Sequence, residues 1–238
     1  AASSSAVQVQ VAVAAVNDAP VASGSATLVS VAEDTASPSG ATVSSLFSGN
    51  FSDATDAVTS GSSANTLAGV AITGYTADAA KGSWQYTTNG STWNTIGTVS
   101  DTSSLTLGVG TNDKVRFVPT SNWNGTAPSL TARLIDSSTT VTSGSTGVNV
   151  SSNGGTTAIS TGTVTLSTSV TAVNDAPVIV SGHETTTLTA VNEDSASPSG
   201  ATVTSLFGGS FSDSTDGVTG GSSANTLAGV AITGYTAD

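Results

Sequence analysis

The stretch "VQVQVAVAAVNDAPV" at Val7–Val21 returns as "VTLSTSVTAVNDAPV" at Val164–Val178. In both places, an alternating run of apolar and small or polar residues leads into the same Asn-Asp-Ala-Pro string. Alternation with a period of two predicts a β-strand with one buried face. The proline that follows fixes its own φ angle and donates no hydrogen bond, so the string predicts a stiff linker. A strand and a linker that occur twice indicate an internal repeat.

A longer match sets the length of this repeat. Glu33–Asp78 is matched almost residue for residue by Glu193–Asp238, which lies 160 residues later, whereas Asn174 follows Asn17 by 157 residues. Three additional residues therefore precede the matched stretch in the second copy. We expect residues 1–15 to be the closing strand of a preceding repeat and residues 16–172 to be a complete repeat. Residues 173–238 would then be a linker and the first part of the next repeat.

The composition favours short strands and tight turns. Ser, Thr, Gly, Ala and Val dominate the 238 residues, and small and β-branched residues suit pleated sheets. Runs such as residues 67–77, 114–119 and 129–135 predict strands, and only "SSLFSG" at Ser44–Gly49 suggests a helical turn. Asn89-Gly90 predicts a hairpin with a type I′ turn. The sequence therefore predicts an all-β fold of tandem β-sandwich repeats, each about 157–160 residues long.

The charge excludes several classes of partner. Four Lys and Arg residues stand against 16 Asp and Glu residues, a formal net charge of −12 at pH 7. An acidic surface repels nucleic acids and anionic membranes and attracts divalent cations. No apolar run approaches the roughly 18 residues of a membrane helix, so membrane insertion is not expected. Without cysteine, disulfides and thiolate metal sites are excluded, and the start without Met or a leader predicts a fragment or a mature segment.

The acidic residues gather at predicted strand ends and in loops. Asp18 and Asp175 lie in the two linkers, and Glu33-Asp34 end a strand. Asp53 and Asp56 form the loop "DATD", and Asp136 ends another strand. Calcium prefers about six to eight oxygens from carboxylates, Asn side chains and backbone carbonyls, which these residues could supply together. Solvated turns are the alternative, since Asp and Asn are common turn formers.

Together these features resemble the cadherin-like tandem repeats of very large secreted bacterial proteins, including RTX-type adhesins. The resemblance spans the whole chain and rests on the order of "AVNDAPV", "VAED" or "VNED", "GSWQYTTNGSTWNTIGTVS", "KVRFVPTSNWNGTA" and "LTARLID". It implies Ig- or cadherin-like sandwiches in series outside the cell, with calcium at their junctions. The chain departs from the family in two ways: its repeat exceeds the about 100 residues of such domains, and its acidic loop is "DATD" rather than Asp-x-Glu or Asp-x-Asp.

The resemblance also implies the calcium ligands. It gives Asn174 and Asp175 the position of the family's Asn-Asp linker, surrounded by the carboxylates of the complete repeat. The full predicted set, with the counterparts in the other copy, is Asn17, Asp18, Glu33, Asp34, Asp53, Asp56, Asp136, Asn174, Asp175, Glu193, Asp194, Asp213 and Asp216.

Catalysis is not expected. The one histidine, His183, lies in the longer segment of the second copy, so no serine of the complete repeat has a histidine base from its own repeat. Asp53 and Asp56 could mimic the paired carboxylates of a glycosidase. They lie in a loop without a neighbouring aromatic platform, and the loop is repeated.

Three functions remain in competition. The first is a structural spacer in the shaft of a secreted adhesin, stiffened by calcium at the repeat junctions. The second is a subunit of an extracellular filament or surface layer, in which identical chains join head to tail by β-strand complementation. The third is a carbohydrate-binding module that would use Trp84, Trp93 or Trp123, against which stands the value of these side chains in a thin core.

The segment Ile179–Asp238 lacks the counterpart of residues 79–170. So short a segment cannot bury much apolar surface alone, and its strands would present open edges. We expect it either to pair with another chain, through a strand such as Val7–Val16, or to be less well ordered than the complete repeat.

Overall fold

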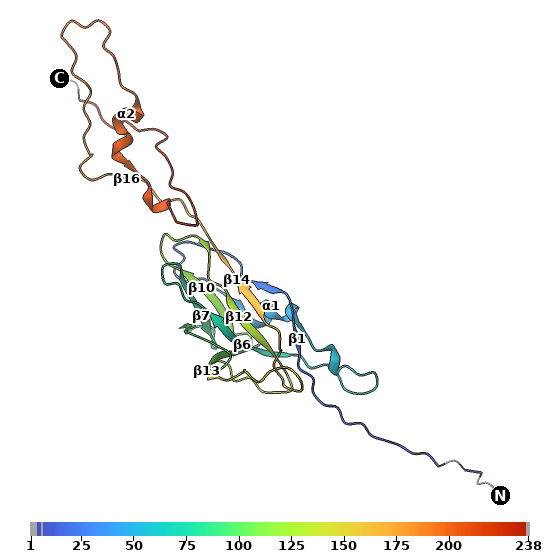
Figure 1. The fold of residues 1–238 in the computed structure, drawn as a ribbon. Helices are drawn as coiled ribbons and strands as arrows, with labels where there is room; N and C mark the ends of the chain where they lie inside the picture. Colours follow the sequence, from blue (N-terminus) through green and yellow to red (C-terminus); the bar gives the residue numbers. More distant parts are fainter. Residues whose placement is uncertain (1–3, 6, 237–238) are drawn as a thin grey trace.

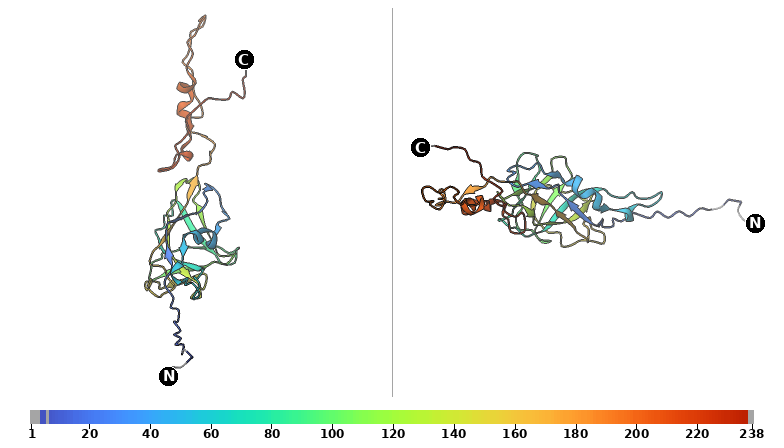
Figure 2. Two further views of the ribbon diagram at one scale, coloured as in Figure 1. Left: turned by 90° about the vertical axis from the view of Figure 1, so that its right-hand side faces the viewer. Right: turned by 90° about the horizontal axis from the view of Figure 1, so that it is seen from above.

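The chain folds into a mainly β protein, with 28% strand and 9% helix. This computed structural model describes residues 4–5 and 7–236. The molecule is elongated: an N-terminal segment (residues 4–5 and 7–15) and a C-terminal segment (residues 173–236) leave a central body (residues 16–172) at opposite ends (Figures 1 and 2). The predicted all-β class is confirmed as a mainly β fold with several antiparallel sheets. No helix in the described part of the chain is long and apolar enough to cross a membrane.

The largest sheet of the central body has six strands in the order β13-β9-β6-β12-β14-β2. Its strands are β2 (Ser25–Thr27), β6 (Leu67–Tyr75), β9 (Ser104–Gly108), β12 (Leu130–Asp136), β13 (Ser145–Val148) and β14 (Val164–Ser167). All neighbours are antiparallel except β14 and β2, which are parallel. An early and a late strand of the body therefore run side by side in the same direction.

The smaller sheets complete the body. The four-stranded sheet has the order β4-β10-β7-β8 and the three-stranded sheet the order β11-β15-β3. Their strands are β4 (Ala41–Thr42), β10 (Lys114–Pro119), β7 (Gly82–Thr87), β8 (Asn94–Thr95), β11 (Gly125–Thr126), β15 (Ser169–Thr171) and β3 (Val31–Ala32). The two-stranded sheets join β1 (Val21–Ala22) with β5 (Phe51–Ser52), and β16 (Val178–Ile179) with β17 (Phe211–Ser212).

The predicted helical turn is confirmed, and it occurs in both copies of the matched sequence. The first copy holds α1 (Val43–Phe47), η1 (Ser48–Asn50) and η2 (Ala54–Asp56); the second holds α2 (Val203–Phe207), η3 (Gly208–Ser210) and η4 (Ser214–Asp216). Both α-helices begin with a threonine cap, whose Oγ1 accepts a hydrogen bond from the backbone N–H three residues later. The same local sequence thus gives the same local structure.

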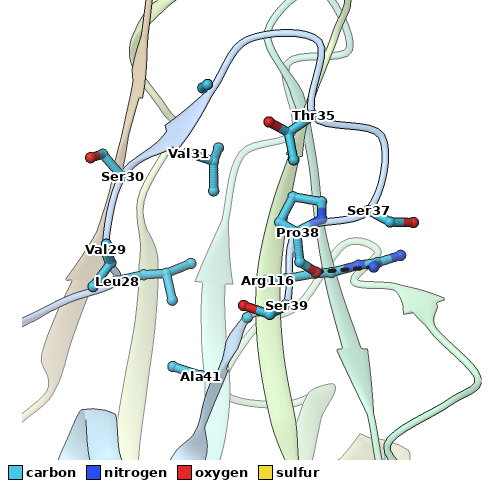
Figure 3. Close-up of a pocket in the computed structure, with 12 residues that line it drawn as sticks. Leu28, Val29, Ser30, Val31, Thr35, Ser37, Pro38, Ser39, Ala41 and Arg116 are labelled. Atoms are coloured by element: carbon cyan, nitrogen blue, oxygen red, sulfur yellow. Dashed lines mark hydrogen bonds between the residues drawn. The ribbon is translucent and has the colours of Figure 1, made fainter.

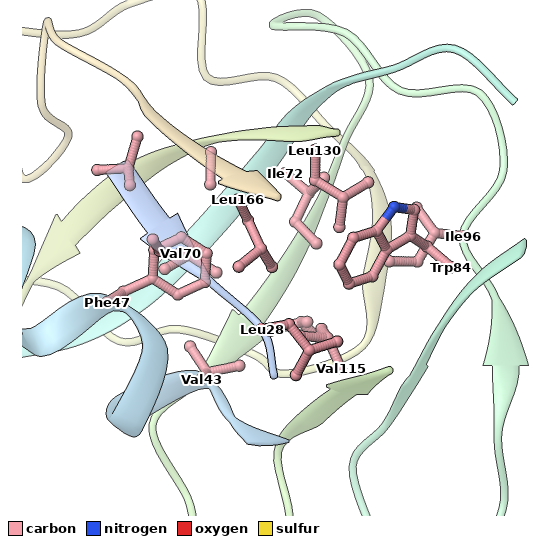
Figure 4. Packing of buried hydrophobic residues seen from close by; sticks show 14 of the residues in the cluster. Leu28, Val43, Phe47, Val70, Ile72, Trp84, Ile96, Val115, Leu130 and Leu166 are labelled. Atoms are coloured by element: carbon pink, nitrogen blue, oxygen red, sulfur yellow. The ribbon is translucent and has the colours of Figure 1, made fainter. Parts of the chain in front are cut away.

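The larger of two apolar clusters among the described residues fills most of the central body (Figure 4). It takes side chains from the six-stranded sheet, the four-stranded sheet and α1, including Leu166, Trp84 and Phe47. Trp84 is fully buried; its indole N–H donates to the Pro128 carbonyl at 2.6 Å, and its ring meets Phe117 edge to face at 5.5 Å. The large aromatic side chain therefore has both an apolar environment and a partner for its polar group.

The strand predicted at Val7–Val16 does not form in this chain. Val7, Val9 and Val13 are 91%, 88% and 90% exposed, whereas their sequence counterparts Val164, Leu166 and Val170 are at most 4% exposed. The described residues of this segment lie against no other strand, and a lone strand has no partner for its backbone groups (Figure 1). Its role as the closing strand of a preceding repeat stays a prediction.

The C-terminal segment has only the short sheet of β16 and β17 among its described residues. Residues 227–235 repeat the sequence of β6 but form no strand there. In the central body, β6 lies between β9 and β12, whose sequences have no copy in this segment. Ile232 and Tyr235 are consequently 86% and 88% exposed, since strand formation depends on neighbours as well as on sequence.

Candidate cation-binding clusters

All predicted ligands except Glu193 and Asp194 fall into two clusters at opposite ends of the central body. The N-terminal cluster lies where the chain enters the body and consists of Asn17, Asp18, Asp53, Asp56, Asn65 and Asp136. The junction cluster lies between the body and the C-terminal segment and consists of Glu33, Asp34, Asn174, Asp175, Asp213, Asp216 and Asn225.

The acidic loop is built by η2 in the N-terminal cluster. Asp53 precedes this 3-10 turn and Asp56 ends it, which places two buried carboxyl groups three residues apart. The Ser62 hydroxyl donates to the Asp56 carbonyl and closes the loop. The Asn65 backbone N–H then donates to Asp53 Oδ2 at 2.7 Å, so that the loop returns to the carboxylate with which it started.

The linker is tied into the same cluster by hydrogen bonds. The Asp18 N–H donates to Asp56 Oδ1 at 2.9 Å. The Asn65 amide nitrogen donates to Asn17 Oδ1 at 2.8 Å and to Asp56 Oδ2 at 3.0 Å. The Asn17 amide in turn donates to Asp136 Oδ2 at 3.4 Å. Carboxylate and amide oxygens from the linker, the loop and a strand end therefore converge here.

Three buried carboxyl groups lie close together in this cluster. Asp53, Asp56 and Asp136 are 5%, 6% and 0% exposed, and neither ion pair of the described residues includes them. Burial, followed by the charges of Asp56 and Asp136, raises the pKa of Asp53, against the lowering effect of the Asn65 N–H. Asp53 Oδ1 is buried without a hydrogen-bond partner. Buried polar atoms are normally paired, and this oxygen is an exception.

The junction cluster repeats this arrangement. The Asp175 N–H donates to Asp216 Oδ1 at 2.9 Å, and the Asn225 N–H donates to Asp213 Oδ2 at 2.8 Å. The Asn225 amide nitrogen donates to Asn174 Oδ1 at 3.0 Å and to Asp216 Oδ2 at 2.8 Å. Asp213 Oδ1 is again buried without a partner.

Two acidic residues of the central body join the junction cluster. Glu33 is 4% exposed, and its Oε1 accepts a hydrogen bond from the Val173 N–H at 2.6 Å. Asp34 has a φ of 64°, and its Oδ1 accepts from the Asn122 N–H at 2.9 Å. Partial desolvation, and then the charges of Asp34, Asp216, Glu33 and Asp213, raise the pKa of Asp175. Carboxylates from both sides of the boundary therefore repel one another across it.

The structure divides the carboxylates that the resemblance placed around one linker. Asp53, Asp56 and Asp136 lie with Asn17 and Asp18, whereas Glu33 and Asp34 lie with Asn174 and Asp175. The remaining predicted ligands, Glu193 and Asp194, are exposed and lie in neither cluster. Asp194 has a φ of 63°, almost that of Asp34, so the local turn is the same in both copies.

Three asparagines that were not among the predicted ligands contact these carboxylates. Asn65 and Asn225 each follow the first aspartate of the acidic loop by 12 residues, and both belong to the matched stretch. That spacing was the signal that could have found them. Asn124 is 3% exposed and donates to Glu33 Oε2 at 3.1 Å. It lies in a stretch that occurs once in the chain, so no internal comparison could single it out.

The donors fit a hard cation, although acidic side chains alone do not form a complete site. Among residues 4–5 and 7–236, no group of three or more His, Cys, Asp or Glu side chains could hold a metal ion. Each cluster instead combines carboxylates with asparagine oxygens and has one buried, unpartnered carboxylate oxygen. An all-oxygen donor set with amide members fits calcium better than zinc.

None of the three tryptophans forms an exposed platform. Trp84 is a core residue, Trp123 is half-buried against the core, and half-buried Trp93 stacks under Arg116 at 4.1 Å. A cavity of about 360 Å³ beside Arg116 is lined by Leu28, Val31 and other residues of the same segment (Figure 3). Arg116 donates to the Pro38 carbonyl at 3.2 Å and twice to Gln85 Oε1, so it holds the cavity wall in place.

No protein-family model, no curated protein and no solved structure matches this chain.

Proposed function

We propose that this chain is a structural spacer without catalytic activity, from the shaft of a secreted bacterial adhesin. In this proposal it consists of Ig- or cadherin-like β-sandwich repeats stiffened by calcium at their junctions. The observation that carries the proposal is the junction cluster, where Glu33 and Asp34 of the body face Asp175, Asp213 and Asp216 of the following segment. Neighbouring repeats are the partners, arranged head to tail outside the cell.

The residues that would hold the ion are those of the two clusters. Bound calcium would neutralise carboxylates that repel one another and would give the buried Oδ1 atoms of Asp53 and Asp213 a partner. The chain's own contribution is to fix the ligands: the backbone N–H groups of Asn65 and Asn225 hold the loops. The N–H groups of Asp18 and Asp175 hold the linkers. A cation at the boundary would then convert a repulsive contact into a stiff one.

Calcium titration of the chain tests this proposal. Extracellular calcium modules bind with a Kd of roughly 10⁻⁴–10⁻³ M. At ten times Kd, one site stabilises the folded protein by about 1.4 kcal/mol. We expect calcium to raise the melting temperature and to narrow the distribution of shapes in small-angle scattering, with magnesium as the control ion. A melting temperature and a scattering profile that are the same in calcium and in chelator would overturn the proposal.

One observation favours a second candidate, a subunit of a self-assembled filament or surface layer. Val7, Val9 and Val13 are exposed in the N-terminal segment, although the same face of the counterpart strand is buried in the central body. A strand with an unused apolar face can add to a sheet edge of another chain. Sedimentation over a range of concentrations tests this: the Val9→Asp variant should dissociate an assembly, and a wild type that stays monomeric at high concentration rules the candidate out.

A further inference from the structure

The boundary between the body and the C-terminal segment contains a contact made by the protein alone. Asn124 lies in the loop Ser121–Gly125, which we call the receiving loop, and it is 3% exposed. Its amide nitrogen donates to Ser222 Oγ at 2.8 Å, and its Oδ1 accepts from the Ser222 N–H at 2.7 Å. The same amide nitrogen donates to Glu33 Oε2. One side chain therefore joins the body, the next segment and the carboxylate that holds the linker.

Glycines allow the two backbones to approach closely at this point. A Cβ on Gly221 would lie 2.3 Å from Asn124 Oδ1 and 2.5 Å from the Asn124 carbonyl oxygen. On the other side of the contact, a Cβ on Gly125 would lie 3.0 Å from the Gly220 carbonyl oxygen. Because the first two distances are shorter than real Cβ contacts, any side chain at position 221 must displace the receiving loop.

The turn Val218–Ser222, which we call the docking turn, forms the same two backbone hydrogen bonds as its counterpart in the first copy. In it, Val218 N–H donates to the Ser222 carbonyl at 2.9 Å and Gly221 N–H to the Val218 carbonyl at 2.9 Å. The first copy, Val58–Ser62, makes both bonds at 3.0 and 2.8 Å. There, the three atoms nearest to a Cβ on Gly61 would all belong to Val58 in its own turn, at 3.2–3.5 Å. A turn that is already formed loses little conformational freedom on docking.

We propose that this turn is a docking element that seats on the Asn-Gly receiving loop of the preceding repeat and sets the angle between repeats without any ion. The first copy of the docking turn, Val58–Ser62, would then seat in the same way on the receiving loop of a repeat that precedes the central body. The exposure of the valine in each turn agrees with this role. Val58 is 58% exposed, whereas its docked counterpart Val218 is half-buried. The inference rests on the proposed function only in that repeats follow one another in series.

A pair of matched variants tests this proposal in the full chain. Gly221→Ala introduces a Cβ against Asn124, and Gly61→Ala introduces the same group in the same turn without a docked partner. Neither glycine has a positive φ, so alanine fits the backbone at both positions. Since the chain has no cysteine, Thr102→Cys and Thr204→Cys provide two exposed sites for spin labels, one in the body and one in α2 of the C-terminal segment.

The readout is the distance distribution between the two labels, recorded in chelator so that calcium makes no contribution. We expect a narrower distribution for the parent chain and for Gly61→Ala than for Gly221→Ala. A parent distribution in chelator as broad as that of Gly221→Ala, or a Gly221→Ala distribution equal to that of Gly61→Ala, would overturn the docking proposal. The same samples in calcium report separately on the ion, because failure of the calcium proposal leaves each distribution the same after calcium is added.

Discussion

Replacing Asp53 by asparagine should change the stability of the central body in opposite directions with and without calcium. Asp53 is 5% exposed, its Oδ1 has no hydrogen-bond partner, and its pKa is raised by burial and by Asp56 and Asp136. Asparagine keeps an oxygen for the Asn65 N–H and removes the charge that burial, Asp56 and Asp136 disfavour. Asp53→Asn should therefore be more stable than wild type in chelator, by on the order of 1 kcal/mol.

Calcium should reverse this order. Asp53→Asn removes a charged ligand, so it should lose most of the about 1.4 kcal/mol that one site contributes at ten times Kd. For a domain of about 150–250 residues, each kcal/mol corresponds to roughly 2–4 °C in melting temperature. The variant should therefore melt a few degrees above wild type in chelator, and its advantage should disappear or reverse in calcium. Calorimetry in the two buffers provides both values.

Asp113→Asn is the matched control for a buried carboxylate outside the clusters. Asp113 is 8% exposed, but its Oδ1 accepts from the Ser143 hydroxyl and its Oδ2 from the Gly110 N–H. Because both oxygens have partners, this variant should be destabilised equally in calcium and in chelator. Equal changes in melting temperature for Asp53→Asn and Asp113→Asn under both conditions would exclude Asp53 as a calcium ligand.

Three further outcomes are expected. Because the pKa of Asp53 is raised above 3.8, the wild type gains stability in chelator as pH falls from neutral towards 3.8, where protonation removes the buried charge. Urea titrations should therefore show that the stability advantage of Asp53→Asn over wild type shrinks over that range. An advantage that stays constant with pH would contradict the raised pKa of Asp53. Asp175→Ala should widen the distribution of angles between the body and the C-terminal segment in small-angle scattering with calcium, while the near-UV circular dichroism of the body stays unchanged. An unchanged scattering profile would exclude Asp175 as a junction ligand. Leu166→Ala should lower the free energy of unfolding by about 2–5 kcal/mol because Leu166 is fully buried. Val9→Ala, at the matching but exposed position, should change it by no more than about 0.5 kcal/mol. A large loss of stability for Val9→Ala in urea denaturation would mean that another chain covers Val9.

Local features of the fold could be predicted from the sequence. The long strands β6, β10 and β12 fall where alternating and β-branched runs predict them, and α1 falls in the predicted helical turn. The hairpin at Asn89-Gly90 was predicted correctly, but its two-residue turn was wrong. β7 ends at Thr87 and β8 begins at Asn94, because Asn89 Oδ1 accepts hydrogen bonds from the N–H groups of Ser91 and Thr92 and so builds a wider loop.

The division of the acidic residues into two clusters could not be predicted, because it depends on strand order. β3 and β15 are parallel, so both end at the same end of the body, and Glu33 therefore reaches the linker that follows β15. β12 runs antiparallel to β14, so Asp136 ends at the opposite end, beside Asn17. A period of two in the sequence gives the faces of a strand and contains no information about its neighbours.

The parallel pairs β2–β14 and β3–β15 determine how the central body responds to tension along the chain. Leu28 and Glu33 donate backbone hydrogen bonds to the carbonyls of Ser167 and Thr171, so the pairing continues from one strand pair to the next. A pull on the two ends of the body draws these parallel strands past each other lengthwise. The load then falls on all of their hydrogen bonds at once, in shear, whereas an antiparallel hairpin pulled from its open end yields one bond at a time. The body should therefore resist stretching until these pairs rupture together.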